Sequence, residues 1–436
     1  MYYAIIGYAM VFLLIYLLMK GKSTPMVLFI ALPLLAGICA GFDVATLNEL
    51  IKKGVGQTTA NAVLFCFSIL YFNMMNELGI FDPLVNFLVK KAGNNIVAIC
   101  VAASLVGIVS HLDGSSSTTL LVTIPAMLPI FQKLRIRPVT LLAICGSALG
   151  VMNLTPWAGP LNRIAVVTTL DLNYLWGLLI PLQVVGVIAS VGLAVYLGFQ
   201  EKRLGAGGVL TGEGDMEAKD LNDPIVIRNK KMLPFNLCLT IALIAVLSWG
   251  KITVYIPFMV AFAIAALVNF PSLKVQDKMI NKYAPAAFFI TATMLASGVF
   301  VGILNGGKPE SMLTEMANLL LQLIPAPIAQ HLHILMGFLG VPIGLVLGGD
   351  AYLYGLLPLC IKVGQNYGIS QEAMSISMVI GKNVGMIISP VFASTYLAIG
   401  LAGVELKDHM KFSFFYLWII SVIMVISGAL MGIYPF

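Results

Sequence analysis

Apolar residues occur in runs of about 16 to 20 along the whole chain, and short polar or charged breaks separate them. An α-helix needs about 20 residues to cross a bilayer, so each run predicts a membrane-spanning helix. In the first half we expect helices over residues 2–19, 25–41, 57–77 and 176–198, a helix-break-helix over 94–132 and a broken helix over 138–170. Two short runs that mix apolar and charged residues, 43–53 and 81–91, predict helices in the membrane interface.

Residues 199–232 are Gly-rich and then charged, which indicates a solvated cytoplasmic linker between two halves. After it we expect helices over 234–249, 254–270, 285–304 and 410–433, a charged segment 272–282, an amphipathic stretch 309–323, a helix-break-helix over 328–362 and a broken helix over 371–402. This order repeats that of the first half, and a shift of 234 residues places Pro156 on Pro390. Each half contains five crossings and one hairpin, so the sequence predicts an inverted repeat of residues 1–198 and 233–436.

Composition agrees with this pattern, because 59% of the 436 residues are hydrophobic and only 10% are charged. These values exclude a soluble domain with one core and indicate an all-α polytopic membrane protein with discontinuous helices. The first apolar run has neither a basic start nor a small-residue cleavage site, so we expect a retained helix. The six cysteines lie in apolar runs without metal-site spacing and are expected to be core residues.

The positions of Lys and Arg predict the orientation in the membrane. With ten crossings, the loops opposite the N-terminus collect 18 Lys and Arg residues, whereas the N-terminal side has only Lys52, Lys53, Lys251, Lys308 and Lys362. Because basic loops stay in the cytoplasm, we expect both termini to lie on the extracytoplasmic side of the membrane.

The two helix-break-helix elements have short second arms. Residues 119–132 and 351–361 would extend roughly 21 and 17 Å as helices, which is less than the hydrocarbon thickness of about 30 Å. The sequence therefore predicts re-entrant hairpins, the first (about 94–132) entering from the cytoplasm and the second (about 328–362) from outside.

Polar residues gather at the hairpin tips and in the helix breaks, where non-helical backbone at membrane depth indicates a wet site. Five hydroxyls in a row at the first tip exceed what ordinary N-capping needs, although capping is the structural alternative. A proline kink is the alternative for the first break. The candidates for substrate binding are Ser115, Ser116, Ser117, Thr118, Thr119, Asn153, Thr155, Gly159, Arg163, Asp350, Lys382, Asn383, Ser389 and Thr395.

Charged residues inside the membrane segments are the sharpest candidates. Arg163 must face protein or water, and its planar fork suits a carboxylate, although snorkelling to the surface is the alternative. Asp113 and Asp350 occupy corresponding tips, and either could ligate a divalent metal or carry a proton. His111 is a further coupling candidate, with a structural role as its alternative. Lys382 either replaces a coupling cation or pairs with Asp350 or Asp113.

These motifs carry a resemblance to a known family. Leu-Asp-Gly-Ser-Ser-Ser-Thr-Thr at 112–119, Val-Met-Asn-Leu-Thr-Pro-Trp-Ala-Gly-Pro at 151–160 and Asp-Ala-Tyr-Leu-Tyr-Gly-Leu-Leu-Pro at 350–358 resemble the metal-citrate:proton symporter family, CitMHS, of the ion transporter superfamily. The resemblance implies a bacterial inner-membrane carrier of metal-bound citrate coupled to protons, and its superfamily implies dimers with elevator-like movement. The chain differs from the family pattern at Ser115, where a second Asp is usual, and at Lys382, where the usual residue is uncharged.

We therefore expect a secondary active transporter that imports citrate, alone or with a divalent cation such as Mg²⁺, as a homodimer in the lipid bilayer. Proton coupling is favoured over sodium because Lys382 disfavours a cation site. The alternatives are a carrier of another di- or tricarboxylate with Na⁺ or another coupling ion, and a cation/proton antiporter. An enzyme is not expected, because the chain has neither a His-Glu-x-x-His motif nor a nucleophile elbow, and no permanently bound cofactor or nucleic acid is expected.

Overall fold

The structure is a computed structural model that describes residues 2–20, 23–80, 82–207, 230–249, 252–306, 311–322, 325–390 and 392–436. Within these residues all regular elements are helices and no strand occurs, so the predicted all-α class is confirmed. Five helices are long and apolar enough to cross a membrane: Val44–Glu77, Ile96–Asp113, Leu172–Arg203, Ala287–Leu304 and Leu406–Leu430. Five shorter apolar helices accompany them in the described part of the chain: Tyr2–Leu14, Pro25–Cys39, Pro138–Met152, Leu233–Leu247 and Tyr255–Asn269.

The first half of the chain forms ten helical elements among the described residues. They are α1 (Tyr2–Met19), α2 (Pro25–Cys39), α3 (Val44–Glu77), α4 (Asp82–Ala92), α5 (Ile96–Ser110), η1 (His111–Asp113), α6 (Ser116–Lys133), α7 (Pro138–Met152), α8 (Gly159–Thr168) and α9 (Leu172–Arg203). Three of these helices begin with typical N-terminal residues. The side chains of Asn95 and Asp171 accept hydrogen bonds from backbone N–H groups as the N-caps of α5 and α9, and Pro138 is the first residue of α7.

The second half of the chain forms fourteen helical elements among the described residues. Its elements are η2 (Lys230–Met232), α10 (Leu233–Trp249), α11 (Tyr255–Asn269), α12 (Leu273–Leu304), α13 (Met312–Leu321), α14 (Ala326–Ala329), α15 (Leu332–Phe338), α16 (Gly340–Val346), η3 (Ala351–Leu356), α17 (Leu357–Gln365), α18 (Gln371–Asn383), η4 (Met386–Ile388), α19 (Ala393–Ala402) and α20 (Leu406–Leu430). Both expected breaks are present, between α7 and α8 and between α18 and α19.

Three predicted boundaries are wrong. The expected surface helix 43–53 and the helix 57–77 are one continuous helix, α3, and the segments 272–282 and 285–304 are likewise one helix, α12. The junction in α3 contains no proline. The junction in α12 contains Pro285, which lies in the interior of the helix without ending it. Helix α9 also continues to Arg203, into the segment that was expected to begin the linker, whereas residues 208–229 lie outside the described residues.

Helices α3 and α12 run antiparallel and touch through glycines. A Cβ atom at Gly54 would overlap the Gly298 carbonyl oxygen, and one at Gly298 would lie 2.6 Å from the Gly54 carbonyl oxygen. Small residues of this kind allow two backbones in a membrane to approach closely. Further along the pair, Lys282 Nζ lies 2.8 Å from Glu77 Oε2, and the Tyr283 hydroxyl donates to the same oxygen. The pair is therefore held at two separate places.

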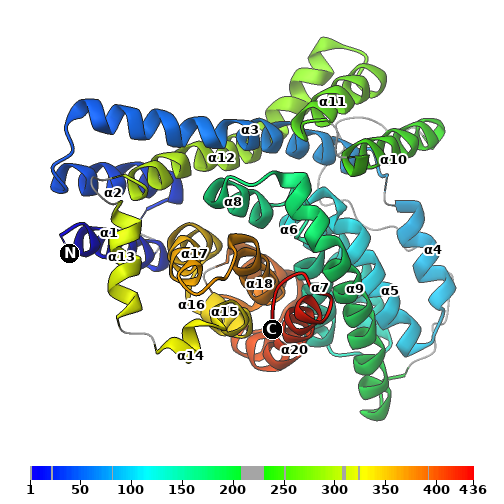
Figure 1. Cartoon of the computed structure of the whole chain (residues 1–436). Helices are drawn as coiled ribbons and strands as arrows, with labels where there is room; N and C mark the ends of the chain where they lie inside the picture. The colour runs from blue at the N-terminus through cyan, green and yellow to red at the C-terminus, as the bar shows by residue number, and fades with distance from the viewer. Residues whose placement is uncertain are drawn as a thin grey trace.

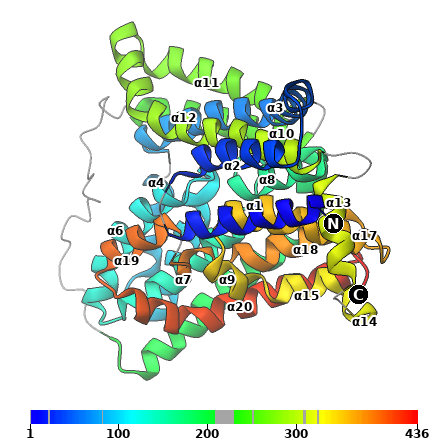
Figure 2. The same ribbon diagram turned by 90° about the vertical axis from the view of Figure 1, so that its left-hand side faces the viewer.

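The helices form two regions with α8 between them. Helices α3, α11 and α12 pack together on one side, and α5, α7, α9, α18 and α20 pack together on the other. Both views place α3, α11 and α12 above α8, and α7, α9, α18 and α20 below it (Figures 1 and 2). Helix α8 also contacts η3 and α18 from the second half, so it lies where the two halves of the chain meet.

Candidate functional site

The two broken helices meet at a pair of buried asparagines. Asn153 follows the last residue of α7, and Asn383 is the last residue of α18. The Asn153 amide donates to Asn383 Oδ1 at 3.2 Å, and the Asn383 amide donates to the carbonyl oxygens of Gly150 at 2.7 Å and Asn153 at 3.2 Å. These bonds join the two halves and occupy backbone carbonyls that the helix end leaves free. Both asparagines were expected at the site, and the structure brings them together.

The tip of the first hairpin reaches this asparagine pair through His111. Its Nδ1 lies 2.7 Å from Thr119 Oγ1, and its Nε2 lies 3.3 Å from Asn153 Oδ1. His111 is fully buried in a turn between α5 and α6. The result is a polar chain from the hairpin tip through the first break to the second half. His111 is thus within hydrogen-bond reach of the expected site.

Hydroxyls at the same tip serve mainly local structure. Ser115 is the N-cap of α6 and accepts from the Thr118 N–H at 3.3 Å, and the Thr119 hydroxyl donates to the Ser115 carbonyl at 2.8 Å. The capping alternative is therefore correct for Ser115. Ser116 is half-buried and Ser117 is exposed.

Asp113 is buried at this tip with one oxygen in use. Its Oδ1 accepts from the Ser115 N–H at 2.8 Å, and Oδ2 has no hydrogen-bond partner among the described residues. The tip packs on the first break, since the Trp157 indole N–H donates to the Leu112 carbonyl at 2.8 Å. The hydroxyl of Thr155, in that break, is also buried without a partner in the described part of the chain.

A cluster of three charges forms around the second hairpin. Arg163 of α8 donates from Nε to Asp350 Oδ1 at 2.7 Å, and Asp350 directly precedes η3. Lys382 of α18 lies close enough to interact electrostatically with both. The side chains of Arg163 and Asp350 are 25% and 18% exposed, and Lys382 is 8% exposed. Three elements distant in sequence therefore place two cations and one anion together, and part of this cluster is accessible to solvent.

Glycines make room for these cations. A Cβ atom at Gly159 would collide with the Arg163 guanidinium, and one at Gly344 would lie 3.0 Å from Lys382 Cγ. A Cβ atom at Gly349 would lie 3.5 Å from Lys382 Nζ. Gly159 was expected at the site, and the structure shows that it leaves space for the guanidinium. Gly344 was missed, because a single glycine in an apolar helix carries no distinctive signal, and Gly349 was not named although it follows Gly348 in the break between α16 and η3.

Hydroxyls at the second break bond to the loop itself and to α16 of the second hairpin. Ser389 donates to the Leu345 carbonyl at 3.3 Å, and Thr395 donates to the Ser389 carbonyl at 2.8 Å. Sequence reasoning missed Asn162, whose buried amide donates to the carbonyls of Pro156 and Ala158 in the first break. The signal was available, since Asn162 directly precedes Arg163 in an apolar helix.

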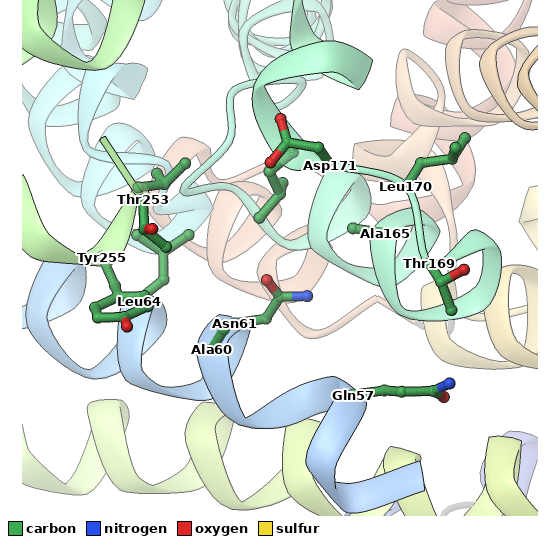
Figure 3. Close-up of a pocket in the computed structure, with 12 residues that line it drawn as sticks. Gln57, Ala60, Asn61, Leu64, Ala165, Thr169, Leu170, Asp171, Thr253 and Tyr255 are labelled. Carbon is green, nitrogen blue, oxygen red and sulfur yellow. The ribbon is translucent and has the colours of Figure 1, made fainter. Parts of the chain in front are cut away.

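A cavity of about 300 Å³ lies on another side of α8. Its lining comes from α3, the corner between α8 and α9, and the start of α11, and Figure 3 shows Gln57 and Asn61 of α3 across from Thr169 and Ala165. Thr169 ends α8 in the left-handed conformation, with φ of 59°. Arg163 does not line this cavity. The cavity therefore separates α8 from α3 and is distinct from the charge cluster.

Known proteins resemble this chain over almost its full length. Residues 4–381 match the CitMHS family, described as citrate transporter. A citrate transporter of Bacillus subtilis (strain 168) is 33% identical over 435 residues, which cover 99% of this chain and 100% of the relative. A Mg(2+)/citrate complex secondary transporter of the same strain is 32% identical over 98% of both chains.

A solved structure shares the fold. The YdaH transporter of Alcanivorax borkumensis, whose crystal structure is described as having an unusual topology, aligns with a TM-score of 0.55 over 90% of both chains at 17% identity. This likeness concerns the fold alone. The family match and the two Bacillus relatives settle the class of protein, because all are transporters and none is an enzyme. The chain belongs to the CitMHS family of citrate transporters.

Proposed function

We propose that this protein imports citrate as a complex with a divalent cation, by secondary active transport coupled to protons. The observation that carries the proposal is the cluster of Arg163, Asp350 and Lys382 between α8, η3 and α18. One curated relative is named for the Mg(2+)/citrate complex, which makes that complex the preferred cargo. An arginine fork and an ammonium are suitable partners for a substrate that presents several carboxylates.

Charge balance favours the metal complex over free citrate. With Arg163 and Lys382 cationic and Asp350 anionic, the cluster has one net positive charge. Fully ionised citrate carries three negative charges, and a bound Mg²⁺ leaves one. The complex therefore neutralises the cluster, whereas free citrate leaves excess negative charge where low polarity makes it costly.

The ion pair suggests how the complex is held. Arg163 and Asp350 are already joined at 2.7 Å and are partly exposed, so an arriving citrate carboxylate can replace Asp350 on the guanidinium. Asp350 is then free to offer an oxygen to the divalent cation, a hard ion that prefers oxygen ligands. Lys382 faces the same space and compensates a further carboxylate. In this scheme each charge of the cluster has a role in binding.

Asp113 is our candidate for carrying the proton. It is buried at the first hairpin tip, apart from the Arg163–Asp350 pair, with one oxygen unused by the described residues. His111 links that tip to the asparagine pair and is assigned a positioning role.

We also propose that the chain is an inverted repeat that moves its site by an elevator mechanism and acts as a homodimer in the plasma membrane. Support for the repeat comes from matched positions 234 residues apart: Thr169 and Gly403 both end their helices with positive φ, and Asp171 and Glu405 both precede the next helix. All candidate site residues lie outside α3, α11 and α12. This division is what a mobile site beside a fixed frame requires.

Citrate uptake into proteoliposomes tests the function. We expect uptake to need Mg²⁺ or another divalent cation, to follow an inward proton gradient and to be abolished in Arg163→Ala. Arg163→Lys keeps the charge without the fork, and we expect it to raise the KM for citrate while the protein remains folded. Uptake that follows Na⁺ would reverse the coupling ion, and normal uptake by Arg163→Ala would remove the cluster from the site.

A further inference from the structure

A second cleft, of about 570 Å³, lies where α7, α9 and α20 come together. Its lining is basic and aromatic: Arg137, Val139, Gln200, Asp408, Lys411, Phe412, Phe415 and Tyr416. It includes none of the residues assigned to citrate or to proton transfer. We propose that this cleft binds the phosphate-containing headgroup of an anionic phospholipid.

Arg137 is fixed at the base of the cleft. Its Nε and Nη2 both lie 2.7 Å from Oε1 of the buried Glu201, and the Thr140 hydroxyl donates to that oxygen at 2.6 Å. The guanidinium also lies over the Phe412 ring at 5.1 Å. Even so, 43% of the Arg137 side chain is exposed. The arginine is therefore preorganised, and its outer part faces the cleft.

The surroundings of the cleft are predominantly basic among the described residues. Lys411 and Asp408 line it. Residues within four positions of its lining residues, at the ends of α6 and α9, in the turn before α7 and at the start of α20, add five exposed cations and one exposed anion: Lys133, Arg135, Lys202, Arg203, Lys407 and Glu405. Asp408 and Glu405 are the exposed anions among these described residues, and Glu201 is already committed to Arg137. A basic pocket between transmembrane helices is suited to an acidic lipid headgroup.

The cleft continues onto apolar surface, which favours a lipid over a free anion. Helices α9 and α20, which both contribute to its lining, pack against each other, and both views place them side by side in the lower part of the molecule (Figures 1 and 2). Each carries exposed apolar or aromatic residues at nearly helical spacing: Val184, Ile188, Tyr196 and Phe199 on α9, and Phe415, Ile419 and Ile423 on α20. Acyl chains would cover these stripes while the headgroup occupies the cleft.

Aromatic rings mark the boundary between the two environments. Phe415 is 62% exposed at the rim, and the Tyr416 ring lies 6.1 Å from that of Tyr196. The Tyr416 hydroxyl reaches Gln200 at 3.5 Å. Aromatic side chains gather at the depth where headgroups meet hydrocarbon. The position of the rings therefore places the charged cleft at headgroup level.

Lipid retention by the purified full-length protein tests this site. Native mass spectrometry would compare bound phosphatidylglycerol with phosphatidylcholine after exposure to equal amounts of each, and we expect a clear preference for phosphatidylglycerol. Removing one basic charge with Lys411→Gln should weaken retention of phosphatidylglycerol about fivefold. The matched control is Lys278→Gln, which removes an exposed lysine of α12 outside the cleft and should have little effect.

Three outcomes would overturn the proposal. The first is equal retention of the two lipids by the unmodified protein, and the second is an equal effect of the two variants. The third is displacement of phosphatidylglycerol by millimolar inorganic phosphate or citrate, which would identify a site for free anions instead. Thermal unfolding of both variants, compared with the parent protein, distinguishes lost lipid binding from lost folding.

Discussion

Replacing Asp350 by Asn separates its two proposed roles: it competes with citrate for the Arg163 guanidinium, and it is a ligand of the divalent cation. The change removes the charge and keeps the shape of the side chain. Exposed ion pairs contribute about 0–1 kcal/mol, whereas breaking a buried pair costs about 3–5 kcal/mol. With 25% and 18% exposure the Arg163–Asp350 pair lies between these limits, at about 1–3 kcal/mol.

The variant should therefore change the preference between free and metal-bound citrate. A citrate carboxylate no longer has to displace Asp350, so binding of metal-free citrate should tighten by about 5- to 100-fold. In the Mg²⁺-citrate complex the metal loses an oxygen ligand, so the complex should no longer bind more tightly than metal-free citrate. Equilibrium binding of radiolabelled citrate to the purified protein, in Mg²⁺ or in EDTA, measures both effects.

The matched control is Asp171→Asn, because Asp171 caps α9 and asparagine caps a helix equally well. This control should bind citrate like the parent protein. The reasoning would be refuted if Asp350→Asn bound metal-free citrate no better than the parent and kept its full stimulation by Mg²⁺.

Three further changes test other parts of the structure. Asn153→Ala leaves the buried partners of Asn153 without a hydrogen bond and should lower the free energy of unfolding by about 1–3 kcal/mol. The protein should then unfold at a lower temperature; an unchanged unfolding temperature would show that the asparagine pair is dispensable. Gly298→Val should reduce the monodisperse yield in size-exclusion chromatography, because its side chain meets the Gly54 backbone, whereas Gly56→Val, with open space around it, should not. Asp113→Asn should abolish uptake driven by a proton gradient but retain citrate exchange, and gradient-driven uptake by this variant would exclude Asp113 as the proton carrier.

The helices and their breaks were predictable because the physical causes are local. The run from Asn153 to Pro160 contains two prolines and a glycine within apolar sequence, and the structure breaks the helix there. The continuity of α3 was not predictable in this way, since charged residues before Gly54 are equally suited to an interfacial helix. Only the partner surface on α12, more than 240 residues later, decides that the helix continues.

At the site, too, contacts between residues distant in sequence could not be predicted from local patterns. Arg163, Asp350 and Lys382 were each selected because a charge inside a membrane segment must have a partner. The sequence left Asp350 and Asp113 open as partners of Lys382, and in the structure Asp350 forms an ion pair with Arg163 and also interacts with Lys382. The two residues are 187 positions apart, and no local pattern connects them. In the hydroxyl run at the first tip, Ser115 caps α6, and a role of the other hydroxyls in binding stays a prediction.

The close contact of α3 with α12 also fixes how the two helices can be aligned. A slip by one residue would shift one helix by about 1.5 Å and rotate its surface by roughly 100°, so that larger side chains would replace glycine at the narrowest point. The Glu77–Lys282 bond would be lost in the same step. Sliding along the pair is therefore blocked sterically at one place and electrostatically at another, so that α3 and α12 keep a single alignment and behave as one rigid unit.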